Sequence, residues 1–279
     1  MFQVKLMRPE DFFFATELAN TMNWNMALED FQYMRNLEPE GCFVLFEDSK
    51  PIGIATSISY GKVGWFGNLI VKEEHRRKGA GRLLLKQAVD YLRSKGAETI
   101  GLYAYPNLVN FYGNQGFKAD KDFAVLHAQI PPTFAKEKLK QIGKRNIQAV
   151  TTFDMGCFGG DRKKLLESII LDEDNLGYFV SENGEVVGYA AAKIYRGMAE
   201  IGPLMCRSSR SDAALSLLCS LLSRLGNLDV YFYVPKESSP ILNALLEIGF
   251  KEAFRVERMF LGPYVARNCI YLAESLERG

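Results

Sequence analysis

The amino-acid sequence predicts a mixed α/β (α+β) protein in which one arrangement of strands and helices is used twice. Apolar segments with strand character alternate with amphipathic helical segments in both halves of the chain. Each half also reaches a short helix closed by Gly-Phe, at Gly116-Phe117 and at Gly249-Phe250. The repeat is roughly 130 residues long, which excludes a solenoid. The chain has 279 residues, enough for two domains of ordinary size.

Turn and capping signals divide the first half into its elements. Acidic residues favour a helix that starts at Arg8-Pro9-Glu10-Asp11, and Glu38-Pro39-Glu40-Gly41 closes the next helix. A turn at Asp48-Ser49-Lys50-Pro51 separates two strands, and Gly96 ends a helix whose leucines share one face. The expected strands are residues 3–7, 42–47, 52–60, 62–71, 99–105 and 123–130, and the helices after the first are 28–37, 82–94 and 108–115.

Pro131-Pro132 is the strongest domain boundary, because two consecutive prolines interrupt helices and strands alike. We expect an N-terminal domain over residues 1–131 and a C-terminal domain over residues 132–279, linked by a helix at 134–141. In the second half, Asn183-Gly184 is a strong hairpin signal. The expected strands there are 178–181, 186–195, 198–206, 228–234 and 254–261, the helices are 162–171, 213–225 and 239–247, and the tail 264–279 adds one more strand or helix.

The overall composition excludes several classes of protein. Lys and Arg number 34 against 33 Asp and Glu, so binding to nucleic acid is not expected. The sequence has no stretch of ~18 apolar residues, and its N-terminus lacks a basic segment followed by a long apolar one. Neither a transmembrane helix nor a signal peptide is predicted. We expect a cytoplasmic protein with no membrane partner.

The cysteines and histidines show no metal-binding or disulfide pattern. The five cysteines are odd in number, far apart and never in a Cys-x-x-Cys pair, which argues against a disulfide framework and a zinc site. Two histidines, His75 and His127, are too few for a His-rich metal centre. Cys157 has no histidine near it in the sequence, so we expect a small buried side chain rather than a nucleophile. No metal is expected.

The most informative segment is the basic turn between the strand ending at Val71 and the following helix. Its sequence, Arg76-Arg77-Lys78-Gly79-Ala80-Gly81-Arg82, places a Gly-x-Gly pair at the start of an amphipathic helix. Glycine lets ligand oxygens approach the backbone N–H groups, and a helix N-terminus stabilises an anion by ~0.3–1 kcal/mol. The four basic side chains can add charge-assisted hydrogen bonds. The alternative is an ordinary turn with a solvated basic face. Leu84 replaces the third glycine of a dinucleotide-binding turn, and the Gly-Lys-Ser/Thr end of a P-loop is absent.

Two elements of this half resemble the GNAT acetyltransferase superfamily. Arg76-Arg77-Lys78-Gly79-Ala80-Gly81 fits the R/Q-x-x-G-x-G/A loop that binds the pyrophosphate of acyl-CoA, and Tyr112 with Gly116-Phe117 fits the later Y-x-x-x-G-F element. Further segments resemble a two-domain branch with an N-terminal GNAT domain and a C-terminal GNAT-like domain. These segments are Tyr105-Pro106, residues 154–162, Ile201-Gly202-Pro203-Leu204 and Arg258-Met259. The resemblance implies tandem GNAT folds, each a mixed, mostly antiparallel sheet flanked by helices.

The resemblance also implies acetyl-CoA as the cosubstrate. In GNAT folds the strand before the loop and the strand after its helix splay apart, and the pantetheine arm pairs in the gap like an additional strand. The main chain of Leu69, Ile70 and Val71 would provide this pairing, although all three also suit an ordinary core strand. The other residues assigned to the cosubstrate are Arg76, Arg77, Lys78, Gly79, Ala80, Gly81, Arg82, Asn107 and Phe111.

Transfer of an acetyl group by direct attack needs a neutral amine, a donor to the developing oxyanion and a proton for the departing thiolate. Tyr112 is the predicted general acid, with a packed core tyrosine as the alternative, and Val71 N–H is the predicted oxyanion donor. No general base is evident, because the strand 62–71 carries no carboxylate. The candidates left open are Glu73, Glu74, Glu98 and a water chain.

Four polar side chains are expected near the acceptor amine. Asn68 interrupts an apolar strand, and it either orients a water or the acceptor or marks a β-bulge. Tyr103 and Tyr105 both point away from the side of the intervening alanine, and one of them is expected to line the gap. Asp154 is a further candidate for contact with the acceptor.

The second half lacks the features of the anion-binding turn. The matching segment is Cys206-Arg207-Ser208-Ser209-Arg210-Ser211-Asp212, with both glycines missing and an acid present, and Leu245 occupies the position that matches Tyr112. We predict that this half does not catalyse, and that it shapes the acceptor pocket or packs a homodimer. Asp161 and Arg162 are candidates for acceptor contact, with helix capping an equal alternative for Asp161.

The sequence therefore predicts a GNAT-type N-acetyltransferase whose N-terminal half moves an acetyl group from acetyl-CoA to a primary amine on a small molecule or peptide. A non-catalytic acyl-CoA-binding or regulatory protein is the rival, which the missing base favours. A protein-interaction scaffold is a third class.

Overall fold

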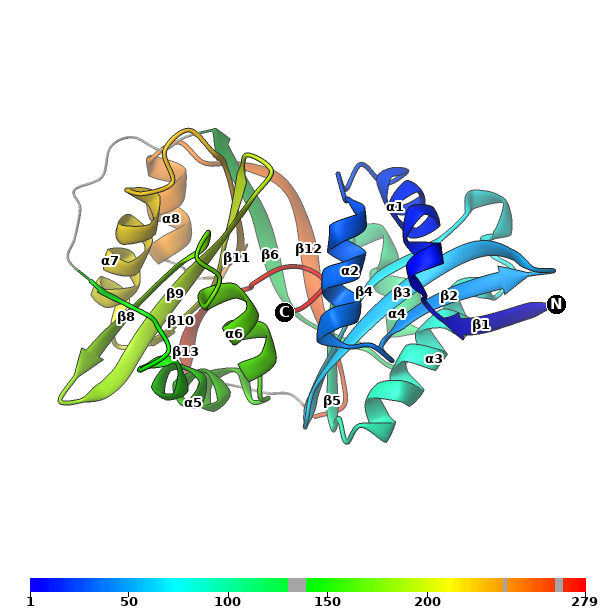
Figure 1. Ribbon diagram of the computed structural model, residues 1–279, viewed down its shortest axis with the longest axis horizontal. Coiled ribbons are helices and arrows are strands. Elements are labelled where there is room, and N and C mark those ends of the chain that lie inside the picture. The colour runs from blue at the N-terminus through cyan, green and yellow to red at the C-terminus, as the bar shows by residue number, and fades with distance from the viewer. Residues whose placement is uncertain (130–138, 238–239, 264–267) are drawn as a thin grey trace. The chain divides into compact units, whose positions relative to one another are not determined.

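The computed structural model describes residues 1–129, 139–237, 240–263 and 268–279. The chain divides into two compact units, Met1–Leu102 with Arg278, and Tyr103–Glu277 with Gly279. Each unit contains a sheet with helices packed against it (Figure 1). No helix among the described residues is both long and apolar enough to cross a membrane.

The sheet of the first unit has the strand order β1-β2-β3-β4-β5. Neighbouring strands are antiparallel except β4 and β5, which are parallel because the helix α3 connects them as a crossover. The strands are β1 (Phe2–Leu6), β2 (Cys42–Glu47), β3 (Lys50–Tyr60), β4 (Val63–Val71) and β5 (Thr99–Ala104), and the helices are α1 (Phe12–Asn20), α2 (Leu28–Leu37) and α3 (Ala80–Ser94).

Helices cover both faces of this sheet. α1 and α2 bury Phe12 and Phe31 against one face, in a cluster that includes Ile54 of β3. On the other face α3 packs very closely, because a Cβ added to Gly64 would lie 2.9 Å from the Leu92 side chain. Glycine at position 64 therefore permits the close approach of helix and sheet.

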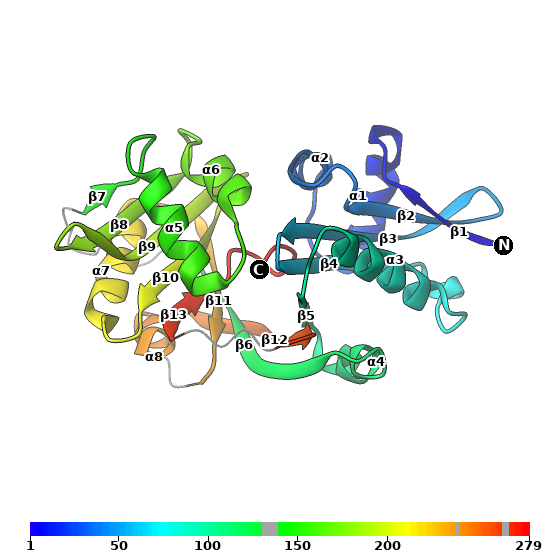
Figure 2. The same ribbon diagram turned by 90° about the horizontal axis from the view of Figure 1, so that it is seen from below.

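The sheet of the second unit has the order β12-β6-β11-β10-β9-β8-β7, and β13 also pairs with β10. α5 and α7 lie on opposite faces of this sheet (Figure 2). Successive residues of β9 reach both faces, because Tyr189 bonds to Asp154 of α5 while Ala190 belongs to the cluster that contains the apolar residues of α7. The strands are β6 (Lys118–Gln129), β7 (Lys140–Gln141), β8 (Leu176–Glu182), β9 (Glu185–Tyr195), β10 (Met198–Arg207), β11 (Asp229–Pro235), β12 (Lys251–Leu261) and β13 (Cys269–Leu272), and the helices are α4 (Val109–Gly113), α5 (Ile147–Phe158), α6 (Lys163–Ile170), α7 (Ser211–Leu222) and α8 (Pro240–Glu247).

β6 explains where the two compact units divide. The sequence assigns this strand to the first half, yet it pairs antiparallel with β11 on one side and β12 on the other. The chain therefore enters the second unit already at Tyr103. The boundary expected at Pro131-Pro132 lies outside the described residues, so the division into repeats at 131/132 stays a prediction.

Most expected elements are confirmed within a few residues. The helix 28–37 and the strand 42–47 have the expected bounds, and the hairpin turn holds Asn183 and Gly184 at positive φ, +49° and +84°. The tail contributes a strand, β13. The linker helix expected at 134–141 falls mostly outside the described residues, and its end forms β7. Helix α5 was not expected, although Ile147, Val150, Asp154 and Cys157 recur at helical spacing and are buried.

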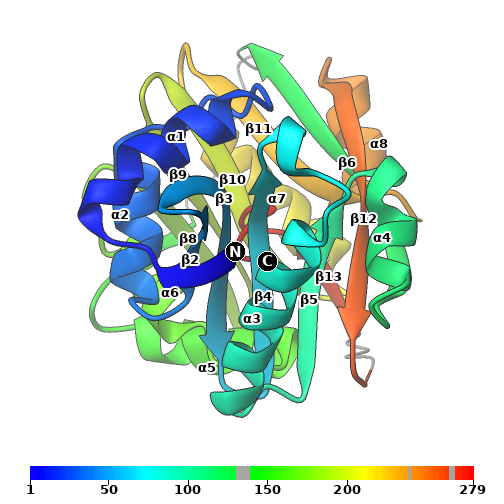
Figure 3. The same ribbon diagram turned by 90° about the vertical axis from the view of Figure 1, so that its right-hand side faces the viewer.

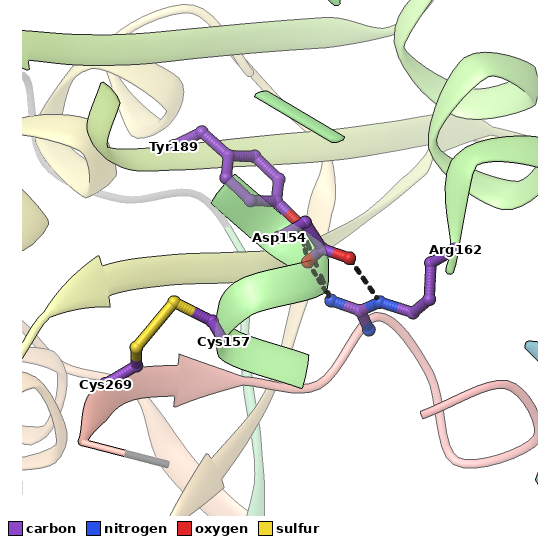
Figure 4. Close-up of a disulfide and its surroundings, with 5 residues drawn as sticks. All are labelled: Asp154, Cys157, Arg162, Tyr189 and Cys269. Atoms are coloured by element: carbon purple, nitrogen blue, oxygen red, sulfur yellow. Dashed lines mark hydrogen bonds and ion pairs between the residues drawn. A yellow bond between two sulfur atoms is a disulfide. The ribbon is translucent and has the colours of Figure 1, made fainter. Parts of the chain in front are cut away.

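A disulfide between Cys157 of α5 and Cys269 of β13 corrects the expectation from cysteine spacing (Figure 4). The two cysteines are 112 residues apart in sequence, so only the folded chain brings them together. Cys157 is therefore not an isolated buried thiol. The bond closes a long loop, which removes conformational entropy from the unfolded chain.

The disulfide predicts the outcome of a thiol titration. In denaturant without reductant, three thiols should react, namely Cys42, Cys206 and Cys219, and after reduction all five. Cys157→Ser with Cys269→Ser should lose about 2–5 kcal/mol of unfolding free energy and still show three thiols. Five reactive thiols in the unreduced protein would contradict the assignment.

Candidate active site

The basic turn connects β4 to α3 (Figure 3). Arg77 has φ +60° and Gly79 has φ +87°, so the backbone turns sharply before α3 begins at Ala80. A side chain at position 79 would be strained, which explains the glycine there. The N–H groups of residues 77–82 donate to no acceptor in the described part of the chain. They are available to a ligand at the N-terminus of a helix.

Four cations surround this turn, and no described residue provides an anionic partner for them. Arg76, Arg77, Lys78 and Arg82 are exposed, and none of them forms an ion pair with any residue the structure describes. Arg76 donates from Nε to the carbonyl oxygen of Val71 at 2.9 Å, which holds its guanidinium beside the end of β4. The turn therefore presents concentrated positive charge that an anionic ligand would neutralise.

One edge of the strand that leads into the turn pairs with no strand of the described ranges over much of its length. β4 pairs with β3 along nearly its whole length, but its parallel pairing with β5 covers only residues 63–65. From Phe66 to Val71, no strand in the described ranges pairs with that edge. This gap matches the one that the resemblance implies between these two strands.

The ladder with β3 fixes the direction of the main chain beside this gap. Lys72 N–H donates to the Ile52 oxygen at 2.8 Å, so these residues form a hydrogen-bonded pair. Because antiparallel pairs alternate, Val71 turns its N–H and C=O toward the unpaired edge, whereas Ile70 turns its own toward β3. Leu69 lies in a bulge. Of the three residues expected to pair with the arm, Val71 has the required orientation.

Asn68 lies at a β-bulge, one of the two roles considered for it. The register between β3 and β4 shifts by one residue and leaves Asn68 and Leu69 together opposite Ala55. Asn68 has φ +50°, a left-handed conformation that asparagine tolerates better than most residues. It is 4% exposed, and Nδ2 donates to Thr56 Oγ1 at 3.1 Å. Its Oδ1 accepts no hydrogen bond from any described residue.

Tyr112, the predicted general acid, is buried on α4 of the second unit. The rings of Phe111 and Phe117 approach it edge-on, with centroids at 5.0 Å and 6.0 Å. Burial raises the pKa of the Tyr112 hydroxyl well above its ordinary value, so the group stays protonated at neutral pH. Asn107, also assigned to the cosubstrate, is exposed ahead of α4.

Tyr103 and Tyr105 belong to an aromatic cluster of the second unit. The Tyr103 ring packs edge-on to Phe123 with centroids 4.9 Å apart, and its hydroxyl lies 3.3 Å from that of Tyr271. Burial raises the pKa of Tyr103 well above 10. The Tyr105 ring lies 5.6 Å from Phe254. Both side chains are therefore engaged with aromatic partners of their own unit.

Asp154 and Arg162 form a closed, fully buried ion pair, which corrects their expected place at the acceptor (Figure 4). Arg162 donates to both carboxylate oxygens, at 3.1 Å and 2.6 Å, and the Tyr189 hydroxyl donates to one of them at 2.5 Å. Arg162 also donates to the Gly279 oxygen at 2.7 Å. The network joins α5, the start of α6 and β9. Asp161 lies one residue before Arg162, the N-cap of α6, and accepts the Lys163 N–H at 2.9 Å.

The carboxylates considered as general base are all exposed. Glu98 pairs with Lys62 at 3.2 Å, Glu74 lies 3.8 Å from His75, and Glu73 begins a short 3-10 helix. None of the three is desolvated, the usual way to tune a carboxylate into a base. Among the described residues, no group of three or more His, Cys, Asp or Glu side chains is arranged to hold a metal ion.

In the corresponding turn of the second half, acidic side chains of the same domain pair with the basic ones. Arg210 donates to both oxygens of Asp212, at 2.9 Å and 2.7 Å, and also pairs with Glu182. Arg207 pairs with Glu185 at 2.8 Å. These cations already have anionic partners, in contrast to those of the first half.

Comparison with known proteins decides the family. A model of the acetyltransferase (GNAT) family matches residues 10–117, and a model of the acetyltransferase (GNAT) domain matches residues 150–271. The chain belongs to the GNAT acetyltransferase family. Each half contains one GNAT domain, and the protein is an acyltransferase of the GNAT type.

Relatives extend over nearly the whole chain. The holothin acyltransferase of Pseudoalteromonas sp. (strain SANK 73390) is 24% identical over 278 residues, which are 97% of this chain and 92% of the relative. A putative acetyltransferase from Pyrococcus horikoshii has a TM-score of 0.83 at 21% identity, covering 100% and 96% of the two chains. A tandem GNAT protein from the clavulanic acid biosynthesis pathway has a TM-score of 0.63 at 13% identity, covering 95% and 100%. The tandem fold is thereby confirmed.

In the second GNAT domain, the gap beside the turn is filled by the chain itself. One edge of β10 pairs with β11 over residues 198–201 and then with β13 over residues 204–207, while β9 takes the other edge. Ala273 N–H donates to the Tyr233 oxygen of β11 at 3.2 Å, so β13 lies between the two splayed strands. A peptide strand thus occupies the place where a GNAT fold receives a pantetheine arm.

The buried ion pair predicts a large stability effect. Asp154→Ala should lower the free energy of unfolding by about 3–5 kcal/mol, because it leaves the Arg162 charge buried and uncompensated. Asp161→Asn is the matched control, since it retains an oxygen for the Lys163 N–H. Chemical denaturation of both variants measures the difference, and equal midpoints would contradict a stabilising role for Asp154.

Proposed function

We propose that the protein transfers an acetyl group from acetyl-CoA to a primary amine by direct attack, and that its first GNAT domain binds the acetyl-CoA. One observation carries this proposal: within the described residues, the backbone N–H groups of the turn 77–82, its four cations and the adjoining edge of β4 all lack a partner. The pyrophosphate of CoA suits such a turn, and the amides of its arm suit an unpaired strand edge. The relative named for acyl transfer to holothin supports a small-molecule acceptor.

The proposed chemistry assigns one task to each group. The amine nitrogen attacks the thioester carbon, and Val71 N–H donates to the oxygen as it gains negative charge. The carbon–sulfur bond then breaks, Tyr112 gives its proton to the departing thiolate, and the amine releases a proton to water. The support for Tyr112 is its motif and its protonation at neutral pH.

A non-catalytic acyl-CoA-binding protein is the second candidate. It is favoured by the lack of a carboxylate on β4 and by the exposure of Glu73, Glu74 and Glu98. Release of free thiol from acetyl-CoA in the presence of primary amines distinguishes the two functions. An enzyme releases thiol in proportion to the amine acetylated, whereas a binding protein releases none.

The turn predicts which substitutions weaken acetyl-CoA binding. Arg77→Gln with Lys78→Gln should raise the dissociation constant at least about tenfold, or roughly 1.4 kcal/mol, because two charge-assisted contacts are lost. Isothermal titration calorimetry measures the constant. The matched control is Arg207→Gln with Arg210→Gln in the second domain, where the constant should not change. Equal weakening by both pairs, or no binding by the wild type, would contradict the site.

Tyr112→Phe tests the proposed general acid. The turnover number should fall by about 10²–10⁴, since the thiolate loses its proton donor, while the dissociation constant of CoA stays the same. Thiol release and calorimetry measure the two quantities separately. Unchanged turnover would remove Tyr112 from the mechanism.

A further inference from the structure

Asn68 carries a buried hydrogen-bonding atom for which the described chain supplies no partner. Its Oδ1 is inaccessible to solvent and accepts no hydrogen bond from any described residue. An unpaired buried amide oxygen costs about 1–3 kcal/mol, and folded proteins contain few such groups. The atom is therefore in a position to be satisfied by a bound donor.

The side chain of Asn68 is held in a defined direction. Its Nδ2 donates to Thr56 Oγ1, and Thr56 is fully buried on β3. Ile54, two residues earlier on the same strand, packs under α1 and α2, so Thr56 points to that face. The amide of Asn68 thus lies on the face opposite α3. On α1, which packs against β3 and β4, the buried Thr16 hydroxyl also lacks a partner in the described ranges.

The bulge places Asn68 on the same strand as Val71, the proposed oxyanion donor. Asn68 lies three residues before Val71 on the unpaired part of β4, and a bulge redirects a side chain from the regular alternation of its strand. An amide oxygen accepts a hydrogen bond but takes no proton at neutral pH. β4 itself carries no charged side chain. The strand therefore offers an amine a neutral acceptor and no counter-ion.

We propose that Asn68 Oδ1 positions the acceptor by accepting one N–H of a neutral amine, and that the substrate is accordingly a primary amine of low basicity. This inference rests on the proposed function. A hydrogen bond from one N–H leaves the nitrogen lone pair free to attack. A strongly basic amine arrives as an ammonium ion, which is disfavoured at a buried strand that supplies no carboxylate of its own. A weakly basic amine arrives uncharged and needs no general base before attack.

Two isomeric amines test the substrate class. 4-Methylaniline is weakly basic and benzylamine strongly basic, while their size and composition are the same. With acetyl-CoA at neutral pH, kcat/KM from thiol release should be at least tenfold higher for 4-methylaniline. Equal values, or a preference for benzylamine, would overturn the assignment of a weakly basic substrate.

Variants at position 68 test the positioning role. Glycine tolerates φ +50° as asparagine does, so Asn68→Gly removes the side chain without straining the backbone. This variant should lower kcat/KM for 4-methylaniline at least tenfold and leave the KM for acetyl-CoA unchanged. Asn68→Asp should shift the preference toward benzylamine about tenfold and add an acidic limb to its pH profile, because only the ionised carboxylate pairs with an ammonium ion. An equal rise in the KM for acetyl-CoA in Asn68→Gly would show a merely structural role and overturn the proposal.

A crystal structure with CoA and 4-methylaniline separates the two proposals. The amine nitrogen, or a water where the amine is absent, is expected within about 3.2 Å of Asn68 Oδ1. If the wild type acetylates neither amine but this donor is present, the proposed function fails and the hydrogen-bonding role of Asn68 stands. An Oδ1 facing only apolar atoms overturns that role whatever the activity.

Discussion

The bulge in β4 is the constraint on which the first domain depends. One additional residue in that strand, with Asn68 in a left-handed conformation, changes the register with β3 just beyond the point where pairing with β5 stops. The strand then continues with a free edge that leads to the basic turn. Hydrogen-bonding groups of the main chain and positive charge therefore follow one another along a short segment, as an extended anionic cosubstrate requires.

The two domains share the splayed strands and the turn that follows them, but differ in what pairs with the strand edge and with the basic side chains. In the first, no strand among the described residues pairs with the edge of β4 beyond Trp65, and no described anion pairs with the cations of the turn. In the second, β13 pairs along the equivalent edge, and Arg207 and Arg210 are bound by Glu185 and Asp212. The fold is thus preserved, while the strand edge and the cations of the second domain have partners within the chain.

Local signals were sufficient for much of this description. Helix and strand positions follow from periodicity and turn residues, and Gly79 indicates the sharp turn before α3, while its binding of an anion stays a prediction. Interactions between distant segments were not accessible in this way. Three features join residues that are far apart in the chain. They are the pairing of β6 with β11, the Cys157–Cys269 disulfide and the pairing of β13 with β10. Asp154 looked like a polar site residue because its partners, Arg162 and Tyr189, are brought to it only by folding.

In the second domain, β13 pairs with the edge of β10 that corresponds to the edge of β4 in the first. A domain that receives its extra strand from a diffusing molecule gains stability in proportion to the logarithm of that molecule's concentration. A domain that carries the strand within its own polypeptide, fastened by a covalent bond to α5, gains the same pairing at any concentration. The pairing in the second domain is therefore independent of the concentration of any ligand, and that half serves as a constant framework.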